Sequence, residues 1–299
     1  MNNKKLFLID TYTILYQGYY AYIKNPMLTS NGLNTSPIIN FTHLLIKILN
    51  EEKPSYMAAI FDTSQETFRK KEYHKYKAHR KKTPKAISLS IPYLMKILKS
   101  FRIFFLHAKY GYEADDLIGT IAKKAEKKGY MIYITTLDKD FCQLVTKNIK
   151  IYRPPFKGNT KKILGIKEIK EKFGVKYPEQ VIDLWSMMGD SSDNIPGLPG
   201  IGKKNAIKFI KKYGSLEKLF NSTHDLHGKI KKNIEMNKEL GFLSKKLATI
   251  VTNISIFSFH EKKFLVKKPK WNSIEKIFLE LEFRKLLKSA YQYCIEKTE

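Results

Sequence analysis

Three short apolar runs, each leading into an aspartate, constrain the fold of this chain more than any other feature of its 299 residues. The runs and their aspartates are 6–9 with Asp10, 56–61 with Asp62 and 130–136 with Asp138. Their length and their β-branched or aromatic side chains are typical of buried strands. Helical patterns lie between them, over 38–49, 87–98 and 117–125. This alternation predicts an α/β fold with a mostly parallel sheet and helices on both faces.

The position of the three aspartates suggests a ligand site. In open parallel sheets the ligand crevice lies outside the carboxyl ends of the strands, where Asp10, Asp62 and Asp138 are expected. A single aspartate at a strand end is more often a turn or helix-cap residue. Because all three apolar runs lead into an aspartate, we interpret the three aspartates as converging on one site.

Further acids follow the same pattern. Glu113, Asp115 and Asp116 open a predicted helix, which alone is a common and merely stabilising feature. Asp140 forms a pair with Asp138, and Asp190 and Asp193 lie in a turn-rich segment. Nine carboxylates in one crevice would repel one another unless divalent cations lay among them. Oxygen ligands without His or Cys select Mg²⁺ or Mn²⁺. Two ions about 4 Å apart can clamp a phosphodiester for hydrolysis.

The charge balance indicates a polyanionic partner. Lys and Arg number 55 against 28 acids, which gives a net charge of +27. Nucleic acid is the first candidate and an anionic membrane the second. An AT-rich genome would explain the preference for Lys over Arg, but not the excess of cations over anions. No apolar run approaches the ~20 residues of a spanning helix, so we expect no membrane partner.

The chain divides into three parts by its pattern. We expect an α/β domain over 1–176 with a basic arch near 68–90, a helical domain over 177–260, and a helical tail over 261–299 that packs back on the body. The strand-helix alternation stops after 153–162, and a final amphipathic helix is predicted near 274–291.

Two basic segments fit nucleic-acid contacts. The segment 68–84 carries eight cations against one acid, with Phe68, Tyr73 and Tyr76 interleaved, which suits single strands, although a solvated charged loop is the alternative. The segment 194–206 places three glycines before a helix that starts near Lys203. Backbone N–H groups at such a turn can hold phosphate, as in a helix-hairpin-helix, although glycine-rich turns are often only turns.

The ordered set of motifs over residues 5 to 260 resembles the 5′ nuclease family, most closely the 5′ to 3′ exonuclease domain of bacterial DNA polymerase I, which is related to flap endonucleases. The residues that carry the resemblance are Leu8-Ile9-Asp10, Phe61-Asp62, Thr67-Phe68-Arg69, Tyr76-Lys77 with Arg80, Gly111 to Asp116, Thr136 to Asp140 and Gly189 to Gly197. The resemblance implies a PIN-like nuclease fold followed by a helical helix-hairpin-helix (helix-three-turn-helix) domain.

The resemblance also implies roles for individual residues. Asp10, Asp62, Glu113 and Asp115 would hold one metal, and Asp138, Asp140 and Asp193 the other, with Asp116 and Asp190 completing the acidic ring. Lys77 and Arg80 would act on the scissile phosphate from the arch. Contacts with DNA would come from Arg69, Tyr76, Lys77, Arg80, Gly200, Gly202, Lys203 and Lys204, with K⁺ at the hairpin. Thr11 and Gln17 depart from the family pattern, in which a Gly and an Arg are usual.

We therefore expect a Mg²⁺-dependent 5′ to 3′ exonuclease and 5′-flap endonuclease, with Mn²⁺ as a substitute, that removes RNA primers and flaps in replication and repair. Its substrates would be DNA with 5′ flaps or ends and RNA-DNA primer junctions. The alternatives are a non-catalytic DNA-binding protein of the same fold and a small ribonuclease of a related toxin-like fold. No polymerase motif appears before Glu299, so we expect a separate DNA polymerase as partner. Only two cysteines and no signal peptide suggest a cytoplasmic, nucleoid-associated protein.

Overall fold

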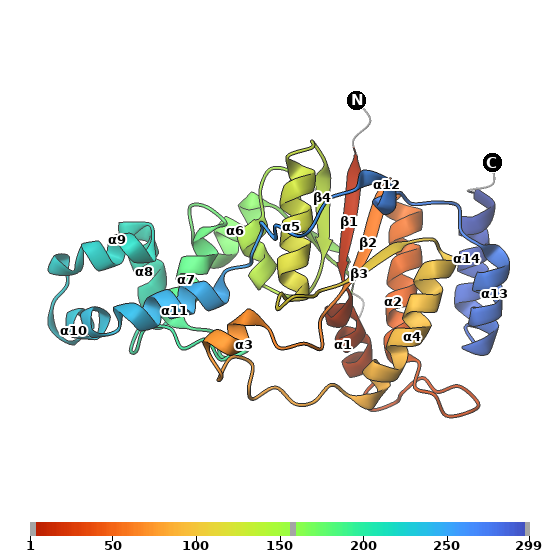
Figure 1. Cartoon of the computed structure of the whole chain (residues 1–299), viewed down its shortest axis with the longest axis horizontal. Helices are drawn as coiled ribbons and strands as arrows, with labels where there is room; N and C mark the ends of the chain where they lie inside the picture. The colour runs from red at the N-terminus through yellow and green to blue at the C-terminus, as the bar shows by residue number, and fades with distance from the viewer. Residues whose placement is uncertain (1–3, 156–159, 297–299) are drawn as a thin grey trace.

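The computed structural model describes residues 4–155 and 160–296 and is built around one six-stranded sheet (Figure 1). The strands are β1 Lys5–Asp10, β2 Tyr56–Phe61, β3 Phe104–His107, β4 Met131–Thr135, β5 Ile149–Arg153 and β6 Lys162–Leu164. Their order is β3-β2-β1-β4-β5-β6, and every pair is parallel except β5 with β6. The predicted mostly parallel α/β architecture is confirmed.

The strand order places the predicted acids at one edge. From β1 the chain moves to β2 on one side, whereas β4 pairs with the other side of β1, so the connections diverge between β1 and β4. In register, Asp10 lies beside Ile60 of β2, and Ile9 lies beside Thr135 of β4. A ligand crevice is expected where neighbouring strands diverge in this way, outside their carboxyl ends.

Helices cover both faces of the sheet. The helices that belong to the α/β part are α1 Thr11–Ala21, α2 Ser36–Lys47, α3 Phe68–Glu72, α4 Lys85–Ser100, α5 Ala114–Glu126 and α6 Ile166–Phe173, with a π-helical turn at Ile48–Glu52 and a 3₁₀ turn at Asp140–Leu144. Leu6 and Leu8 of β1 pack with α5 on one face, whereas Phe7 and Ile9 pack with α1, α2 and α4 on the other. The alternation along β1 therefore divides the interior into two hydrophobic cores.

The second unit is helical and extends from the α5 side of the sheet (Figure 1). Its helices are α7 Gln180–Met188, α8 Lys203–Tyr213, α9 Leu216–Asn221, α10 Gly228–Met236 and α11 Lys238–Ala248, with a 3₁₀ turn at Thr223–Asp225. Helices α7 and α11 pack together, and their side chains join the core that lies under α5. The predicted helical unit after the sheet is thus present.

The turn between α7 and α8 is held together by a close approach of two glycines. Asp190 and Ile195 exchange two backbone hydrogen bonds of 2.9 Å. Gly189 has φ +72°, and a Cβ placed on Gly197 would lie 2.3 Å from the Gly189 nitrogen. No side chain fits in that space, so the two backbones can touch only because both residues are glycine.

The C-terminal segment contains two main helices and not one. After the short α12 Glu261–Phe264, α13 Trp271–Glu280 and α14 Arg284–Glu296 pack against α4 and α2. Glu282, at the break between them, has φ +60°. Ile277, Phe278 and Leu281 fill the core on that side of the sheet. The single amphipathic helix predicted near 274–291 is corrected to a helical hairpin, because the left-handed Glu282 reverses the chain.

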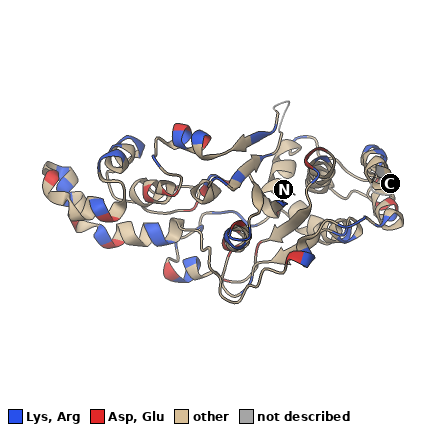
Figure 2. Cartoon of the chain, turned by 90° about the horizontal axis from the view of Figure 1, so that it is seen from above, with Lys and Arg blue, Asp and Glu red and all other residues tan. Residues whose placement is uncertain are grey.

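Basic side chains are not confined to one unit. Figure 2 shows Lys and Arg on helices at both ends of the long axis. Within residues 4–155 and 160–296, no helix is both long and apolar enough to cross a membrane.

Candidate active site

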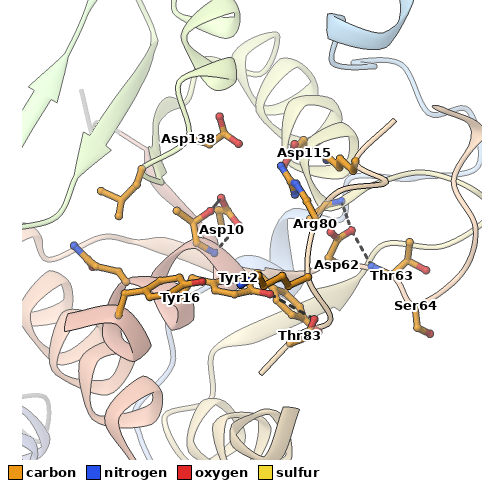
Figure 3. A pocket seen from close by; sticks show the side chains of 17 residues that line it. Asp10, Tyr12, Tyr16, Asp62, Thr63, Ser64, Arg80, Thr83, Asp115 and Asp138 are labelled. Atoms are coloured by element: carbon orange, nitrogen blue, oxygen red, sulfur yellow. Dashed lines mark hydrogen bonds between the residues drawn. The ribbon is translucent and has the colours of Figure 1, made fainter. Parts of the chain in front are cut away.

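A cavity of about 690 Å³ lies at the carboxyl ends of β1, β2 and β4 (Figure 3). Four of the predicted acids line it: Asp10, Asp62, Asp115 and Asp138. Lys77 and Arg80 reach the same cavity from the predicted arch segment. The fold therefore brings together residues that lie up to 128 positions apart, between Asp10 and Asp138.

Asp10 ends β1 and caps α1. Its carboxylate accepts hydrogen bonds from the hydroxyls of Thr13 and, at 2.8 Å, Thr136. Burial disfavours its charge more than these bonds favour it, and the pKa of Asp10 is raised to about 6. The nearby Asp138 carboxylate pushes the pKa in the same direction. Asp10 is thus a buried acid whose charge is only partly compensated by protein donors.

Asp62 and Asp115 face the cavity from the β2 end and the first turn of α5. Asp62 accepts backbone N–H bonds from Thr63 at 2.9 Å and Ala114 at 3.2 Å, which ties the strand end to the start of α5. Burial raises the pKa of Asp62, and the Glu113 carboxylate adds to the shift. Burial also raises the pKa of Asp115 well above its usual value, helped by Asp138 and Asp10. Neither environment favours ionisation without an added cation.

A second group of acids adjoins Asp138. Burial raises the pKa of Asp138 and raises that of Asp140 to about 8, where Asp138, Asp193 and Asp190 add repulsion. One carboxylate oxygen of Asp140 is buried without a hydrogen-bond partner. Asp190 differs from them, because Ser192 and Lys139 outweigh its burial and lower its pKa. The acids beside Asp138 therefore crowd together, and Asp190 is compensated by Lys139 whereas Asp140 has no such cation beside it in an ion pair among the described residues.

Lys77 stands between two predicted ligands. Its ammonium nitrogen lies 2.9 Å from a Glu113 carboxylate oxygen and 3.5 Å from one of Asp193. Despite burial, Lys77 and Arg69 hold the pKa of Glu113 below its usual value. Arg80 pairs with Asp193 at 2.5 Å. In this structure the carboxylates of Glu113 and Asp193 form ion pairs with Lys77 and Arg80, and neither residue lines the cavity.

The arch segment is attached to the helical unit. The Lys77 N–H donates to the Asp193 carbonyl at 2.9 Å, and the Asn194 side chain donates to the Lys75 carbonyl at 2.7 Å. Tyr76 is 4% exposed and donates toward Glu113 or Asp193, each 3.2 Å away. The stacking of Tyr76 on a base is therefore corrected: its ring is packed inside, because its hydroxyl binds the acids.

Arg69 and Asp116 also differ from their predicted places. Arg69 is 2% exposed, and its guanidinium grips the Asp116 carboxylate through two bonds of 2.8 and 2.7 Å. Asp116 is fully buried and also accepts the N–H of Glu113 at 3.0 Å. Arg69 is not available to DNA, and Asp116 does not line the cavity. The predicted DNA contact of Arg69 and the predicted place of Asp116 in the acidic ring are therefore corrected: the two residues form a buried structural ion pair. The reason is that each provides the charge that the other needs in the core.

The chemistry of the cavity suits a hard divalent cation. Its acidic side chains are the four carboxylates of Asp10, Asp62, Asp115 and Asp138. Burial raises the pKa of each, so an added cation would stabilise their charged forms. As the side chains stand, no three or more His, Cys, Asp or Glu residues among those described form a group that could hold an ion. The case for a divalent cation therefore rests on the carboxylate oxygens and on their raised pKa values.

The predicted hairpin residues lie at the start of α8. Gly202 is the residue before the helix, Gly200 has φ +77°, and Lys203 and Lys204 are exposed. A Cβ on Gly202 would meet no atom within 4 Å. The Asn233 side chain of α10 donates to the Pro199 carbonyl at 3.4 Å. The turn thus presents an open backbone and two cations, separate from the acidic cavity.

Sequence reasoning missed the aromatic wall of the cavity. Tyr12, Tyr16 and Tyr20 of α1 line it, and the rings of Tyr16 and Tyr20 stack at 6.1 Å. The three tyrosines follow Asp10 and are spaced four residues apart. This spacing was the available signal, since such residues share one helix face.

The two positions that depart from the family pattern lie near Asp10. Gln17 accepts a hydrogen bond from Asn40 at 3.2 Å, and Thr11 is fully buried.

Two family models together match most of the chain. The model "5′-3′ exonuclease, N-terminal resolvase-like domain" matches residues 5–174, and "5′-3′ exonuclease, C-terminal SAM fold" matches 176–272. The chain belongs to the 5′-3′ exonuclease family. The resemblance found in the motifs is thereby confirmed.

Relatives of this exonuclease family occur alone and within longer proteins. The 5′-3′ exonuclease of Aquifex aeolicus is 33% identical over 96% of this chain and 95% of the relative. DNA polymerase I of Caldicellulosiruptor bescii is 37% identical over 95% of this chain, and that of Bacillus subtilis 40% over 85%. The chain spans only 33% and 28% of these two polymerases.

Solved structures share the exonuclease fold at lower identity. The T5 5′-exonuclease, solved with divalent zinc ions bound, superposes with a TM-score of 0.67 at 20% identity and covers 99% of this chain and 100% of its own. The catalytic core of Rad2 in complex with DNA superposes with a TM-score of 0.64 at 17% identity, covering 97% and 92%. These similarities confirm the fold.

Proposed function

We propose that this 5′-3′ exonuclease family member is a divalent-metal-dependent hydrolase that cuts DNA from the 5′ end and at 5′ flaps. The carrying observation is the cavity in which Asp10, Asp62, Asp115 and Asp138 face Lys77 and Arg80. The carboxylates can bind divalent cations, and the side-chain cations beside them can bind a phosphate. This combination fits hydrolysis of a phosphodiester better than a reaction on a neutral substrate. The net charge of +27 supports a nucleic-acid substrate.

We assign two Mg²⁺ ions to the site, with Mn²⁺ as a substitute. Asp10, Asp62 and Asp115 would hold one ion and Asp138 and Asp140 the other, while Glu113 and Asp193 could join after Lys77 and Arg80 turn to the substrate. When bound, such ions activate water and stabilise the leaving oxygen of a phosphodiester. We also propose a K⁺ ion at the Gly200–Gly202 turn, as the family resemblance implies.

The residues of this chain would handle the substrate in two places. Lys77 and Arg80, at the cavity, would neutralise the scissile phosphate and orient the 5′ strand. The backbone at Gly200 and Gly202, with Lys203 and Lys204, would hold duplex phosphates away from the cut. We propose the corresponding division into an α/β domain over 1–176 with its arch near 68–90, a DNA-binding domain over 177–260, and a tail over 261–299.

In the cell, this activity would remove RNA primers and 5′ flaps during replication and repair. The enzyme would act in the cytoplasm on chromosomal DNA and receive its substrate from a DNA polymerase. The similarity to 33% and 28% of the length of two DNA polymerase I chains supports such a partnership.

A cleavage assay tests the proposal directly. A duplex with a 5′-labelled flap is incubated with the protein in Mg²⁺, in Mn²⁺ and with EDTA. We expect short labelled products with either metal and none with EDTA, and the same duplex labelled at a recessed 3′ end should not be shortened from that end. Metal-independent cutting, or binding without any cutting, would refute the proposal, and the second result would favour the non-catalytic alternative.

A further inference from the structure

One face of α5 is attached to the backbone of the segment that returns from the helical unit, residues 247–257, which we name the return segment. Asp116, Thr120 and Lys124 are spaced by four residues and so share one face of the helix. Asp116 accepts the Val251 N–H at 2.8 Å. Thr120 accepts the Ile254 N–H and donates to the Val251 carbonyl, both at 3.3 Å. Lys124 donates to the carbonyls of Ile254 and Phe257.

The contact is close along its whole length. A Cβ on Gly119 would lie 2.8 Å from Ile250, so the return segment rests directly on the helix. Gln143 donates to the Ala248 carbonyl and accepts the Ile250 N–H, both at 2.9 Å. In the return segment, all of these polar side chains bind backbone N–H and C=O groups, so they position its backbone directly.

The same segment is bound to the base of the arch. Arg69 of α3 donates to the carbonyls of Leu247 at 2.9 Å and Thr249 at 2.6 Å while it holds Asp116. Asp116 in turn accepts the N–H of Glu113, and Arg69 lies 3.5 Å from the Glu113 carboxylate. One buried ion pair therefore joins the arch, the acidic start of α5 and the return segment.

The other end of the return segment leads to the hairpin. It continues directly from α11, whose Ser244 accepts the N–H of Gly197 at 3.0 Å. A displacement of Gly197 would thus displace α11, and with it the backbone carbonyls to which Arg69 donates. The path consists of the hydrogen bond between Ser244 and Gly197, the helix α11 and the hydrogen bonds from Arg69 to the Leu247 and Thr249 carbonyls.

We propose that Arg69, Asp116 and Thr120 are positioning residues that make the arch and Glu113 respond to duplex bound at the helical unit. This inference rests on the proposed function and adds a regulation to it: the chain would cut a 5′ strand fast only when a duplex is engaged beside it. A short single strand, which does not reach the hairpin, would be cut at a basal rate that does not depend on these bonds.

The experiment compares Thr120→Val with Thr120→Ser, which keeps the hydroxyl, in the full chain. Single-turnover rates are measured with Mg²⁺ on a 5′-flap duplex and on a short single strand, and affinity for the flap duplex is measured without metal. We expect Thr120→Val to lose about fivefold or more of the flap rate, with the single-strand rate and the duplex affinity within about twofold of the parent. Thr120→Ser should match the parent.

Other outcomes decide against the coupling. Equal losses on both substrates would make Thr120 merely structural, and no loss on either would remove it from the path. Lys124→Gln, at a half-buried position of the same face, gives a second variant that should show the same selective loss if Thr120→Val does not fold. A parent that cuts neither substrate would refute the proposed function instead.

Hydrogen exchange provides a readout that does not depend on catalysis. In the metal-free parent, binding of the flap duplex should slow exchange of the Val251 and Ile254 amides, since the return segment would be held more firmly. Unchanged exchange at both amides under saturating duplex would overturn the inference.

Discussion

Asp115 and Asp116 are neighbours in the first turn of α5, yet they belong to opposite kinds of site. Asp116 is buried against the Arg69 guanidinium, which supplies its counter-charge from within the fold. Asp115 faces the cavity, where burial and the carboxylates of Asp138 and Asp10 raise its pKa. The difference teaches that a buried acid with its own cation holds the structure together, whereas buried acids that share too few cations indicate a site for a cation from solution.

The largest expected effects come from exchanging one carboxylate for an amide at these two positions. Asp115→Asn should slow flap cleavage by at least about 100-fold, because it removes a metal ligand. It should leave the free energy of unfolding unchanged or higher, because it relieves repulsion. Asp116→Asn should lower that free energy by about 3 kcal/mol, because Arg69 stays charged and buried.

Cleavage rates and urea unfolding measure both effects, and Asp138→Asn serves as a second cavity variant. A cleavage rate of Asp115→Asn or Asp138→Asn within about tenfold of the parent, or an unfolding free energy of Asp116→Asn equal to that of the parent, would remove the distinction.

The next effect tests the cations that face the cavity. Lys77→Ala should lower the single-turnover rate by about tenfold or more, because its charge would stabilise the transition state, while duplex affinity changes little. Lys75→Ala, at an exposed position of the same segment, is the matched control and should retain the parent rate. Equal losses in binding and in rate would instead assign Lys77 to a simple backbone contact.

The pH dependence of stability should sharpen the comparison further. The pKa of Asp10 is raised to about 6 and that of Asp140 to about 8, so the folded state binds more protons than the unfolded state between about pH 4 and pH 8. These groups should lower the free energy of unfolding of the metal-free protein as pH rises through that window, by at most about 1.4 kcal/mol per pH unit for each proton.

Unfolding in urea at several pH values, with EDTA or with Mg²⁺, measures this slope. Asp140→Asn should make the slope less negative, and Mg²⁺ should do the same for the parent, because bound ions favour the charged carboxylates. An identical slope for the parent with EDTA, the parent with Mg²⁺ and Asp140→Asn would show that the pKa values of these acids are not raised in the folded protein.

The smallest effect lies at the hairpin, far from both aspartates. Lys203→Ala with Lys204→Ala should flatten the salt dependence of flap-duplex binding by up to about two units, at roughly 0.9 for each phosphate contact. Cleavage of a short single strand should be nearly unaffected. Lys262→Ala with Lys263→Ala, on the exposed side of α12, is the control and should keep the parent slope. If the hairpin variant kept that slope as well, the turn would be only structural.

The strands next to the site were visible in the sequence because they are buried on both faces. β1 and β2 are continuous apolar runs, and β4 differs only by its half-buried Met131 and Tyr133. The four residues of β3 are all half-buried, the three residues of β6 are mostly exposed, and neither strand was predicted. Propensity alone could not place them, since pairing with β2 and β5 makes them strands.

The site could be predicted in part for a similar reason. Acids at strand ends must share an edge, so Asp10, Asp62 and Asp138 were brought together by topology alone. The partners of Arg69 and Tyr76 could not be inferred in this way, because a basic, aromatic segment does not reveal which of its side chains turn inward. Those partners, Asp116 and the Leu247 and Thr249 carbonyls for Arg69, come from distant segments.

The close approach of Gly189 and Gly197 bears on how this sequence can vary. Any side chain at Gly197 would overlap the backbone of Gly189, so a library of single substitutions should be depleted there even when only expression of folded protein is selected. Gly202 has open space around it, and substitutions at that position should survive selection for folding and disappear only under selection for DNA processing. Within one turn, the two kinds of selection would thus leave separate marks.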